Sequence, residues 1–141
     1  MAAALSLGSA DRALKQAAQY ANERVVWGKP IGTHQALSHP LAACKIELEL
    51  ARAMTQRACA LYDAGFKGAG EAANMAKYAA AEAAIHSVDA AIQTHGGNGV
   101  ADEYGLSDMW WGVRLARIAP VSKEMILNYV AEHSLGLPRS Y

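Results

Sequence analysis

The chain has 141 residues, with 13 basic and 13 acidic side chains and two cysteines, which suits one domain with a single hydrophobic core. The charges are balanced and interspersed, so no surface for nucleic acid or an anionic membrane is indicated. No run approaches the ~18 apolar residues of a membrane span, and the first residues lack the basic segment of a signal peptide. We therefore expect no nucleic-acid partner and no membrane insertion.

A first helix is expected to end near Val26. Side chains that are mostly apolar recur there at the three- and four-residue spacings of an amphipathic helix, and this stripe is Leu7, Asp11, Leu14, Ala18, Ala21 and Val25. The segment WGKPIG follows. Pro30 lacks a backbone N–H, and the glycines beside it favour turns. The sequence therefore predicts a turn over residues 27–32.

A second helix is expected from an N-cap at Thr33 to a C-terminal glycine at Gly65. Its apolar positions include Leu37, Leu41, Leu48, Met54, Ala58 and Leu61. A helix of this span is about 45 Å long, which is typical of a bundle. Cys44 and Cys59 lie on it roughly 22 Å apart, which forbids a disulfide between them and favours a reducing compartment.

A third helix, over about 70–95, is rich in alanine, and small side chains let a neighbouring helix approach closely. A short helix with Trp110 and Trp111 follows, and then a last helix that Gly136 stops. We find no useful β-alternation and no internal repeat. The predicted fold is all-α, an up-and-down four-helix bundle with a short additional helix before the last one, forming one domain over residues 1–141.

The stretch IQTHGGNGVADEY, residues 92–104, ends the third helix in three closely spaced glycines. One glycine is enough to terminate a helix. The others allow something to approach the backbone closely, and a nucleotide phosphate or sugar is one candidate. From the residues alone, both the cap-and-turn interpretation and the nucleotide interpretation stay open.

Metal chemistry is not indicated. A di-iron bundle needs a Glu-x-x-His pair on each of two helices, whereas Glu82 and His86 are four residues apart and Glu132 directly precedes His133. No C-x-x-C, Walker or nucleophile-elbow motif occurs. We interpret His34, His39 and His86 as packing or hydrogen-bonding groups.

Arg24 and Trp27 each have two interpretations. Arg24 closes the first helix beside a glycine-rich turn, either as a solvated cation at a helix C-terminus or as a phosphate contact that uses its planar fork. Trp27 is either a core or interface anchor or a surface on which a ring stacks.

Three segments together resemble the carboxy-terminal helical domain of flavin-dependent acyl-CoA dehydrogenases: YANERVVWGKPIGTHQAL, AIQTHGGNGVADEY and RIAPVSKEMILNYVAEHSLGLPRSY. The resemblance covers essentially the whole chain. An arginine with an aromatic-Gly-Lys-Pro turn, a His-Gln pair and a Gln-x-x-Gly-Gly-x-Gly turn occur in the family's order and at family-like distances.

This resemblance implies contacts to FAD. In that family the glycine turn lies against the adenosine and pyrophosphate end of an FAD held largely by a neighbouring subunit. Arg24 matches the arginine that reaches the pyrophosphate, Trp27 replaces a phenylalanine, and Ser122 matches a hydroxyl residue near the adenine or phosphate. The implied cofactor-binding residues are Arg24, Trp27, His34, Gln35, Gln93, Gly96, Gly97 and Ser122.

The implied reaction is α,β-dehydrogenation of an acyl-CoA thioester, in which a carboxylate base removes the α-proton and the flavin accepts the β-hydride. Pro120 stands where many members carry that glutamate, so no catalytic residue is predicted. Some branches carry the base at a position that would lie about four residues before Met1. Glu124 is close in sequence but sits a turn into the last helix, which makes it a poor substitute.

The leading hypothesis is the carboxy-terminal domain of an FAD-dependent acyl-CoA dehydrogenase, inactive alone, which meets acyl-CoA through the complete enzyme in the cytoplasm or another reducing compartment such as the mitochondrial matrix. A homo-oligomer is expected, with the alanine-rich helix, the GLPRSY end and exposed tryptophans as contact surfaces. The alternative is a non-enzymatic helical oligomerisation module derived from that family. An adaptor that binds FAD or CoA without turnover is a third possibility, disfavoured because half a nucleotide site seldom gives useful affinity.

Overall fold

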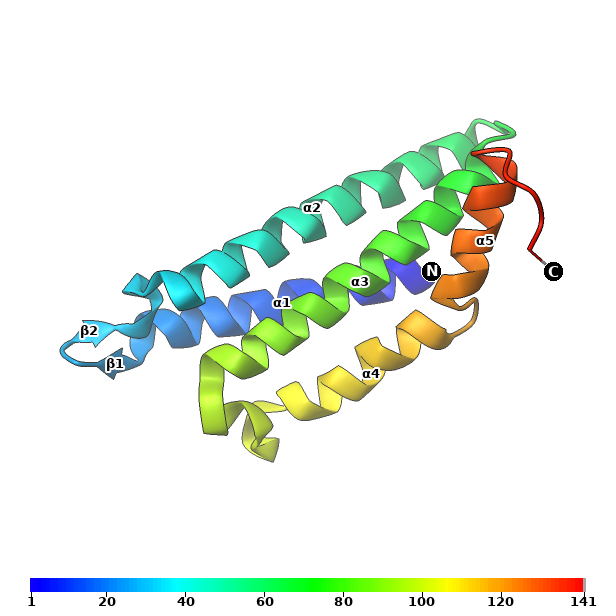
Figure 1. Ribbon diagram of the computed structural model, residues 1–141. Helices are drawn as coiled ribbons and strands as arrows, with labels where there is room; N and C mark the ends of the chain where they lie inside the picture. The colour runs from blue at the N-terminus through cyan, green and yellow to red at the C-terminus, as the bar shows by residue number, and fades with distance from the viewer. Residues whose placement is uncertain (141) are drawn as a thin grey trace.

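The computed structural model describes residues 1–140 and confirms the all-α bundle (Figure 1). Its helices are α1 (Ala2–Glu23), α2 (Gln35–Asp63), α3 (Ala69–His95), α4 (Leu106–Ile118) and α5 (Lys123–His133). A small hairpin, β1 (Val25–Val26) with β2 (Lys29–Pro30), joins α1 to the 3₁₀ turn η1 (Ile31–Thr33), while η2 (Gly96–Val100) and η3 (Asp102–Tyr104) join α3 to α4. Tyr141 lies outside the described residues.

The helix α3 is the centre of the bundle, since α1, α2, α4 and α5 all pack on it. Its buried face is mostly alanine, which fits the close approach expected from small side chains. The buried alanines are Ala72, Ala76, Ala80, Ala81, Ala83, Ala84 and Ala91. These side chains face the chain's own helices, so a subunit contact through α3 stays a prediction for its exposed residues.

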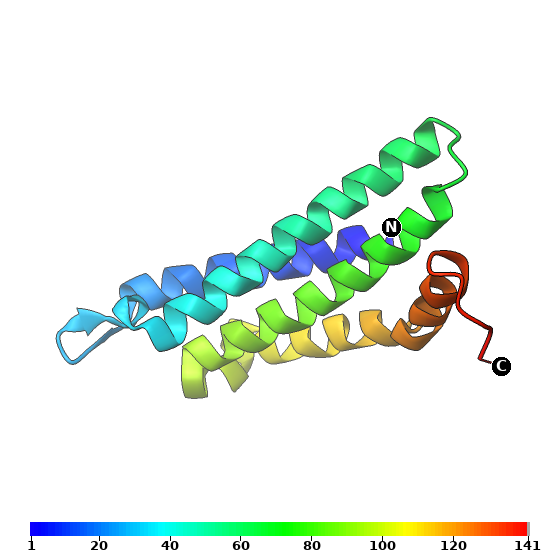
Figure 2. The same ribbon diagram turned by 45° about the horizontal axis from the view of Figure 1, so that its top comes forward.

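The last two helices differ in detail from the sequence prediction. The helix α4 has 13 residues and lies along α3, whereas α5 has 11 residues and turns across the end of the bundle (Figures 1 and 2). The short additional helix is therefore α5, and α4 completes the bundle. Leu106 of α4 and Ile126 of α5 are almost fully buried and anchor the two helices.

The helix α1 ends at Glu23 and not at Val26. Arg24 already has extended backbone angles, and Val25 pairs with Pro30 across the hairpin. Of the predicted stripe, Ala18 and Val25 are exposed. Val25 is not part of the buried face because the chain leaves helical geometry before it. The residues that α1 does bury are Ser6, Leu7, Ala10, Ala13, Leu14, Ala17 and Ala21.

The helix α2 has one predicted end right and one wrong. Thr33 is not its N-cap, since this residue lies in η1 and its hydroxyl donates to the Pro30 carbonyl at 2.8 Å. His34 takes that position. Gly65 is confirmed as the C-terminal glycine, with φ of 67° and its N–H donated to the Tyr62 carbonyl at 3.0 Å, which gives the left-handed helix end that glycine favours.

Both cysteines are free, with Cys44 buried and Cys59 exposed. Burial raises the pKa of the Cys44 thiol, which keeps that group protonated in the core. In the described part of the chain, no helix is long and apolar enough to cross a membrane. The same residues contain no group of three or more histidine, cysteine or acidic side chains placed to hold a metal ion.

Candidate functional site

The hairpin after α1 presents Trp27 to solvent in an unusual backbone conformation. Trp27 has φ of 52° and Gly28 has φ of 75°, as in a two-residue turn with both central residues left-handed. Trp27 is the one non-glycine among residues 1–140 with positive φ, and its side chain is 88% exposed. A bulky side chain in this region is strained, so its position holds the indole away from the bundle.

Arg24 and His34 lie on either side of this hairpin. The Ile31 N–H donates to the Arg24 carbonyl at 2.8 Å, which closes the hairpin at its base. His34 lies edge-on to Trp27, with ring centroids 6.0 Å apart. Its Nε2 atom is buried without a hydrogen-bond partner. Such an atom usually has a partner, and the one on His34 is enclosed by the chain's own atoms. Gln35, the next residue, is exposed at the start of α2.

The glycines after α3 have different structural roles. Gly96 ends the helix with φ of 59° and donates its N–H to the Gln93 carbonyl, as a helix-terminating glycine does. A Cβ at Gly99 would lie 2.4 Å from the Ile92 carbonyl oxygen, so the chain's own backbone fills the space that this glycine leaves. A Cβ at Gly97 would meet nothing within 4 Å. A Cβ at Gly96 would likewise meet nothing within 4 Å, so the nucleotide interpretation stays a prediction for Gly96, Gly97 and the exposed Gln93.

The hairpin and the glycine turn lie at the same end of the molecule (Figure 1). Tyr20 near the end of α1 stacks on His95 at the end of α3, with ring centroids 4.2 Å apart. This contact joins the two chain segments that the sequence marks as cofactor-facing. The predicted residues that gather at this end are Arg24, Trp27, His34, Gln35, Gln93, Gly96 and Gly97.

Ser122 lies far from these residues. The carbonyl of the preceding residue, Val121, accepts from Lys77 near the start of α3, and about 27 Å of helix axis separates Lys77 from His95. The Ser122 hydroxyl accepts a hydrogen bond from the Met125 N–H at 3.3 Å and caps α5. Its role as a cofactor contact therefore stays a prediction, and it shares no site with the hairpin within one chain.

The position expected for a catalytic base carries no proton acceptor. Pro120 is exposed in the segment between α4 and α5. The pKa of the Glu124 carboxyl is lowered chiefly by a hydrogen bond from the backbone N–H of Glu124; desolvation opposes this shift and a hydrogen bond from Ser122 adds to it. A lowered pKa makes a carboxylate a weaker base at neutral pH. Glu124 is thus a poor substitute, as expected.

A hollow of about 540 Å³ lies beside Pro120, between the start of α1 and the end of α4. Its walls are mostly apolar and include Met1, Leu5, Leu115 and Pro120. Pro120, where the resemblance places the catalytic glutamate, borders it together with Met1. This hollow can hold an apolar chain, but the groups around it cannot remove a proton.

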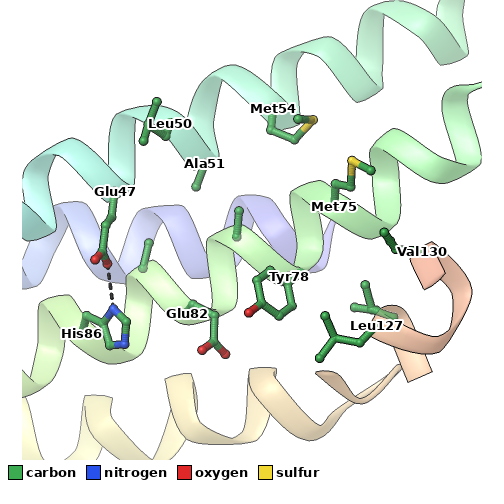
Figure 3. A pocket seen from close by; sticks show the side chains of 13 residues that line it. Glu47, Leu50, Ala51, Met54, Met75, Tyr78, Glu82, His86, Leu127 and Val130 are labelled. Carbon is green, nitrogen blue, oxygen red and sulfur yellow. Dashed lines mark hydrogen bonds and ion pairs between the residues drawn. The ribbon is translucent and has the colours of Figure 1, made fainter. Parts of the chain in front are cut away.

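A second apolar hollow, of about 650 Å³, lies between α2, α3 and α5 (Figure 3). Glu47 and His86 form an ion pair across one end of it at 2.7 Å. The remaining walls are largely Met54, Met75 and Leu127 with their neighbours. None of the predicted cofactor residues lines this hollow.

Sequence reasoning missed the side chains that hold the glycine turn in place. Tyr104 packs edge-on against His95 with ring centroids 5.3 Å apart, and Asn98 donates to the hydroxyls of both Tyr20 and Tyr104. Asn98 and Tyr104 lie within the stretch that the sequence had already singled out. Their spacing carries no periodic signal, so only the fold brings them together.

The chain is therefore an all-α domain in which the predicted site residues at this end lie at the hairpin after α1 and at the glycine turn after α3. Residues 1–135 match the family model described as "Acyl-CoA dehydrogenase, C-terminal domain". The chain belongs to the acyl-CoA dehydrogenase family, as the carboxy-terminal domain.

Relatives and solved structures agree with that assignment. Acyl-CoA dehydrogenase FadE12 of Mycobacterium tuberculosis is 59% identical over 142 residues, which cover 100% of this chain and 37% of FadE12. The structure titled "FAD complex of PigA" is 33% identical, with a TM-score of 0.91 over 96% of this chain and 35% of that one. Butyryl-CoA dehydrogenase of Megasphaera elsdenii is 30% identical, with a TM-score of 0.89 over 95% and 34%. The chain thus spans about a third of the length of these proteins.

Proposed function

We propose that this chain forms one wall of an FAD site in an acyl-CoA dehydrogenase and does not catalyse the reaction alone. The observation that carries this proposal is the convergence of the Arg24 hairpin and the glycine turn, which Tyr20 and His95 join at 4.2 Å. The FAD complex of PigA, with its TM-score of 0.91, supports FAD as the ligand.

The residues at this end fit the cofactor. A guanidinium is suited to both oxygens of a phosphate, and Arg24 extends from an exposed segment. Gly97 leaves open space beside the backbone, so a sugar or phosphate can approach closely. His34 lies beside Trp27 at this hairpin, with ring centroids 6.0 Å apart. When bound, FAD supplies the hydride acceptor of the dehydrogenation.

The substrate end of the proposal rests on the hollow beside Pro120. Its apolar walls suit the acyl chain of a thioester, and Pro120 gives no proton acceptor. In the complete enzyme we expect a carboxylate other than the residue at position 120 to remove the proton. An acyl-CoA bound there would be oriented by this chain but would not react on it.

The test is an assay of the purified chain with FAD and a series of acyl-CoA thioesters of different lengths. We expect no dye reduction above a free-flavin blank. Titration should also leave FAD fluorescence unchanged up to high micromolar concentrations, because one wall of a nucleotide site gives little affinity. Dye reduction that depends on the acyl-CoA would overturn the inactive-domain proposal, and tight FAD binding would favour the adaptor.

We further propose that the outer face of α2 packs against a second copy of the chain. Exposed side chains recur there at alternating three- and four-residue spacings, which is the pattern of a helix-pairing seam. This seam consists of Ala43, Ile46, Leu50, Ala53, Arg57 and Ala60, all exposed. A two-fold axis brings the same patch of both copies together, so Ile46 and Leu50, each flanked by alanine, can pack against their own counterparts.

Analytical sedimentation measures whether the chain self-associates through α2. Leu50→Glu should shift the chain toward monomer, because it places a charge in the centre of the seam. Leu5→Glu is the matched control, since Leu5 and Leu50 are 68% and 67% exposed. Equal dissociation by both changes would reject α2 as the contact. Self-association through α2 without any role at the hairpin end would favour the oligomerisation module.

The two free thiols fit a cytoplasmic or other reducing compartment.

A further inference from the structure

Four side chains from four segments meet behind the glycine turn. His95 ends α3, Tyr20 belongs to α1, Tyr104 belongs to η3, and Asn98 lies in η2. The rings of Tyr20 and Tyr104 pack on His95 at 4.2 and 5.3 Å, and they meet each other edge-on at 6.1 Å. We call this group the Asn98 cluster.

Asn98 closes the cluster with hydrogen bonds. Its Nδ2 atom donates to the Tyr20 hydroxyl at 3.1 Å and to the Tyr104 hydroxyl at 3.2 Å. An amide nitrogen carries two protons, so both bonds can form together. The turn is thereby tied to α1 on one side and to η3 on the other.

Tyr20 connects the cluster to the hairpin. Its backbone carbonyl accepts from the Arg24 N–H at 2.8 Å, while its ring stacks on His95 and its hydroxyl accepts from Asn98. His95 is fixed in turn, since its Nδ1 atom lies 2.7 Å from the Ala91 carbonyl, which can only accept. A short path of contacts therefore runs from the glycine turn to Arg24.

We propose that Asn98 is a positioning residue that sets the glycine turn at a fixed place relative to Arg24. This explains the asparagine among the glycines, because Gly96 and Gly99 provide the backbone shape and Asn98 fixes that shape to α1. The inference rests on the proposed function for what the two segments face, which is the cofactor. Asn98 itself holds the turn through the two tyrosines.

A local effect separates positioning from general stability. The side chain of Asn98 is exposed, and the core depends on the alanines of α3 and on large buried residues such as Leu48 and Leu106. Removing the Asn98 amide should therefore loosen the turn without unfolding the bundle.

The experiment is residue-resolved amide hydrogen exchange by NMR on the full chain. Asn98→Ala should speed exchange over residues 97–101 on the order of fivefold to thirtyfold, as expected for the loss of one or two hydrogen bonds of about 1 kcal/mol. The melting temperature and the exchange of α3 core amides should stay unchanged. Asn74→Ala is the matched control, because Asn74 Nδ2 donates to Gly70 at the other end of α3.

A double-mutant cycle tests the mechanism. Replacing both tyrosines by phenylalanine keeps the rings and removes the acceptors, so it should speed exchange of the turn as Asn98→Ala does. Adding Asn98→Ala to that background should then have little further effect. Unchanged exchange in Asn98→Ala, additive effects in the cycle, or equal loosening by Asn74→Ala would each overturn the proposal.

The same variants separate this inference from the proposed function. In a flavin-carrying hybrid with the amino-terminal part of FadE12, Asn98→Ala should weaken FAD retention as well as loosen the turn. Faster exchange with unchanged retention would confirm the positioning of the turn and remove its role toward FAD. Faster FAD loss with unchanged exchange would contradict the positioning role.

Discussion

The predicted cofactor residues at the two ends of the bundle have different surroundings. At the hairpin end, Trp27 projects from a strained turn and the His34 Nε2 atom has no partner. At the α5 end, Ser122 caps a helix and Glu82 joins Arg117 and Lys123 at 2.9 and 3.0 Å. The hairpin thus presents an exposed ring to solvent, whereas Ser122 and Glu82 hold helices together. The family resemblance points to residues at both ends, and only their contacts in the structure distinguish the two ends.

Breaking the ion pairs at the α5 end should give the largest loss of stability. Glu82→Gln leaves Arg117 and Lys123, which are mostly buried, without their counter-charge. We expect the free energy of unfolding to fall by about 2 kcal/mol, measured by urea denaturation, since unpaired buried charges are costly.

Glu49→Gln is the control for that change. Glu49 pairs with Lys45 and Arg52 on the exposed face of α2, where salt bridges contribute little. If Glu49→Gln lowers the free energy of unfolding as much as Glu82→Gln does, the loss comes from removing a negative charge and not from breaking the contact between α3, α4 and α5.

The second prediction concerns the cap of α5. Ser122→Ala removes the hydroxyl that accepts from Met125 and should cost about 1 kcal/mol of stability. Ser122→Asp should restore most of it, because aspartate also caps helices well. If Ser122→Ala leaves the urea midpoint unchanged, the hydroxyl is not needed for the helix, and its predicted cofactor contact becomes the better explanation.

The smallest effect is expected at the hairpin, with the opposite sign. Trp27→Asn replaces a strained residue by one that accepts a left-handed conformation before glycine, so the chain should gain about 0.5 kcal/mol. Flavin retention in the hybrid should fall at the same time, because the exposed indole is lost. A destabilised chain would mean that Trp27 is held by packing and that its strain has no functional purpose.

Periodicity and composition carried most of the fold. Three- and four-residue spacing predicted α1, because helical burial repeats with that period. Apolar positions between two predicted ends gave α2, and alanine content gave α3, each to within a few residues. The hairpin was missed as a hairpin. Its strands, Val25–Val26 and Lys29–Pro30, are too short for a two-residue alternation to appear, so the sequence indicated only a turn.

The candidate site divides in a similar way. Glycine spacing located the turn, but sequence could not say that Gly99 faces the Ile92 carbonyl while Gly97 faces open space. It also could not place Ser122 apart from Arg24, since a linear motif carries no distance along α3. The Asn98 cluster unites residues from four segments, and no single stretch encodes such a contact.

The most direct test of the account measures bound FAD in a hybrid in which this chain replaces the matching 142 residues of FadE12, with unmodified FadE12 purified alongside as the flavin reference. We expect the hybrid to carry FAD in the same proportion as the reference, and Arg24→Ala to lose most of it while Arg12→Ala, at an exposed position of α1 outside the α2 seam, loses none. A folded hybrid without flavin, or full retention in Arg24→Ala, would contradict the claim that this end of the bundle is a wall of the FAD site.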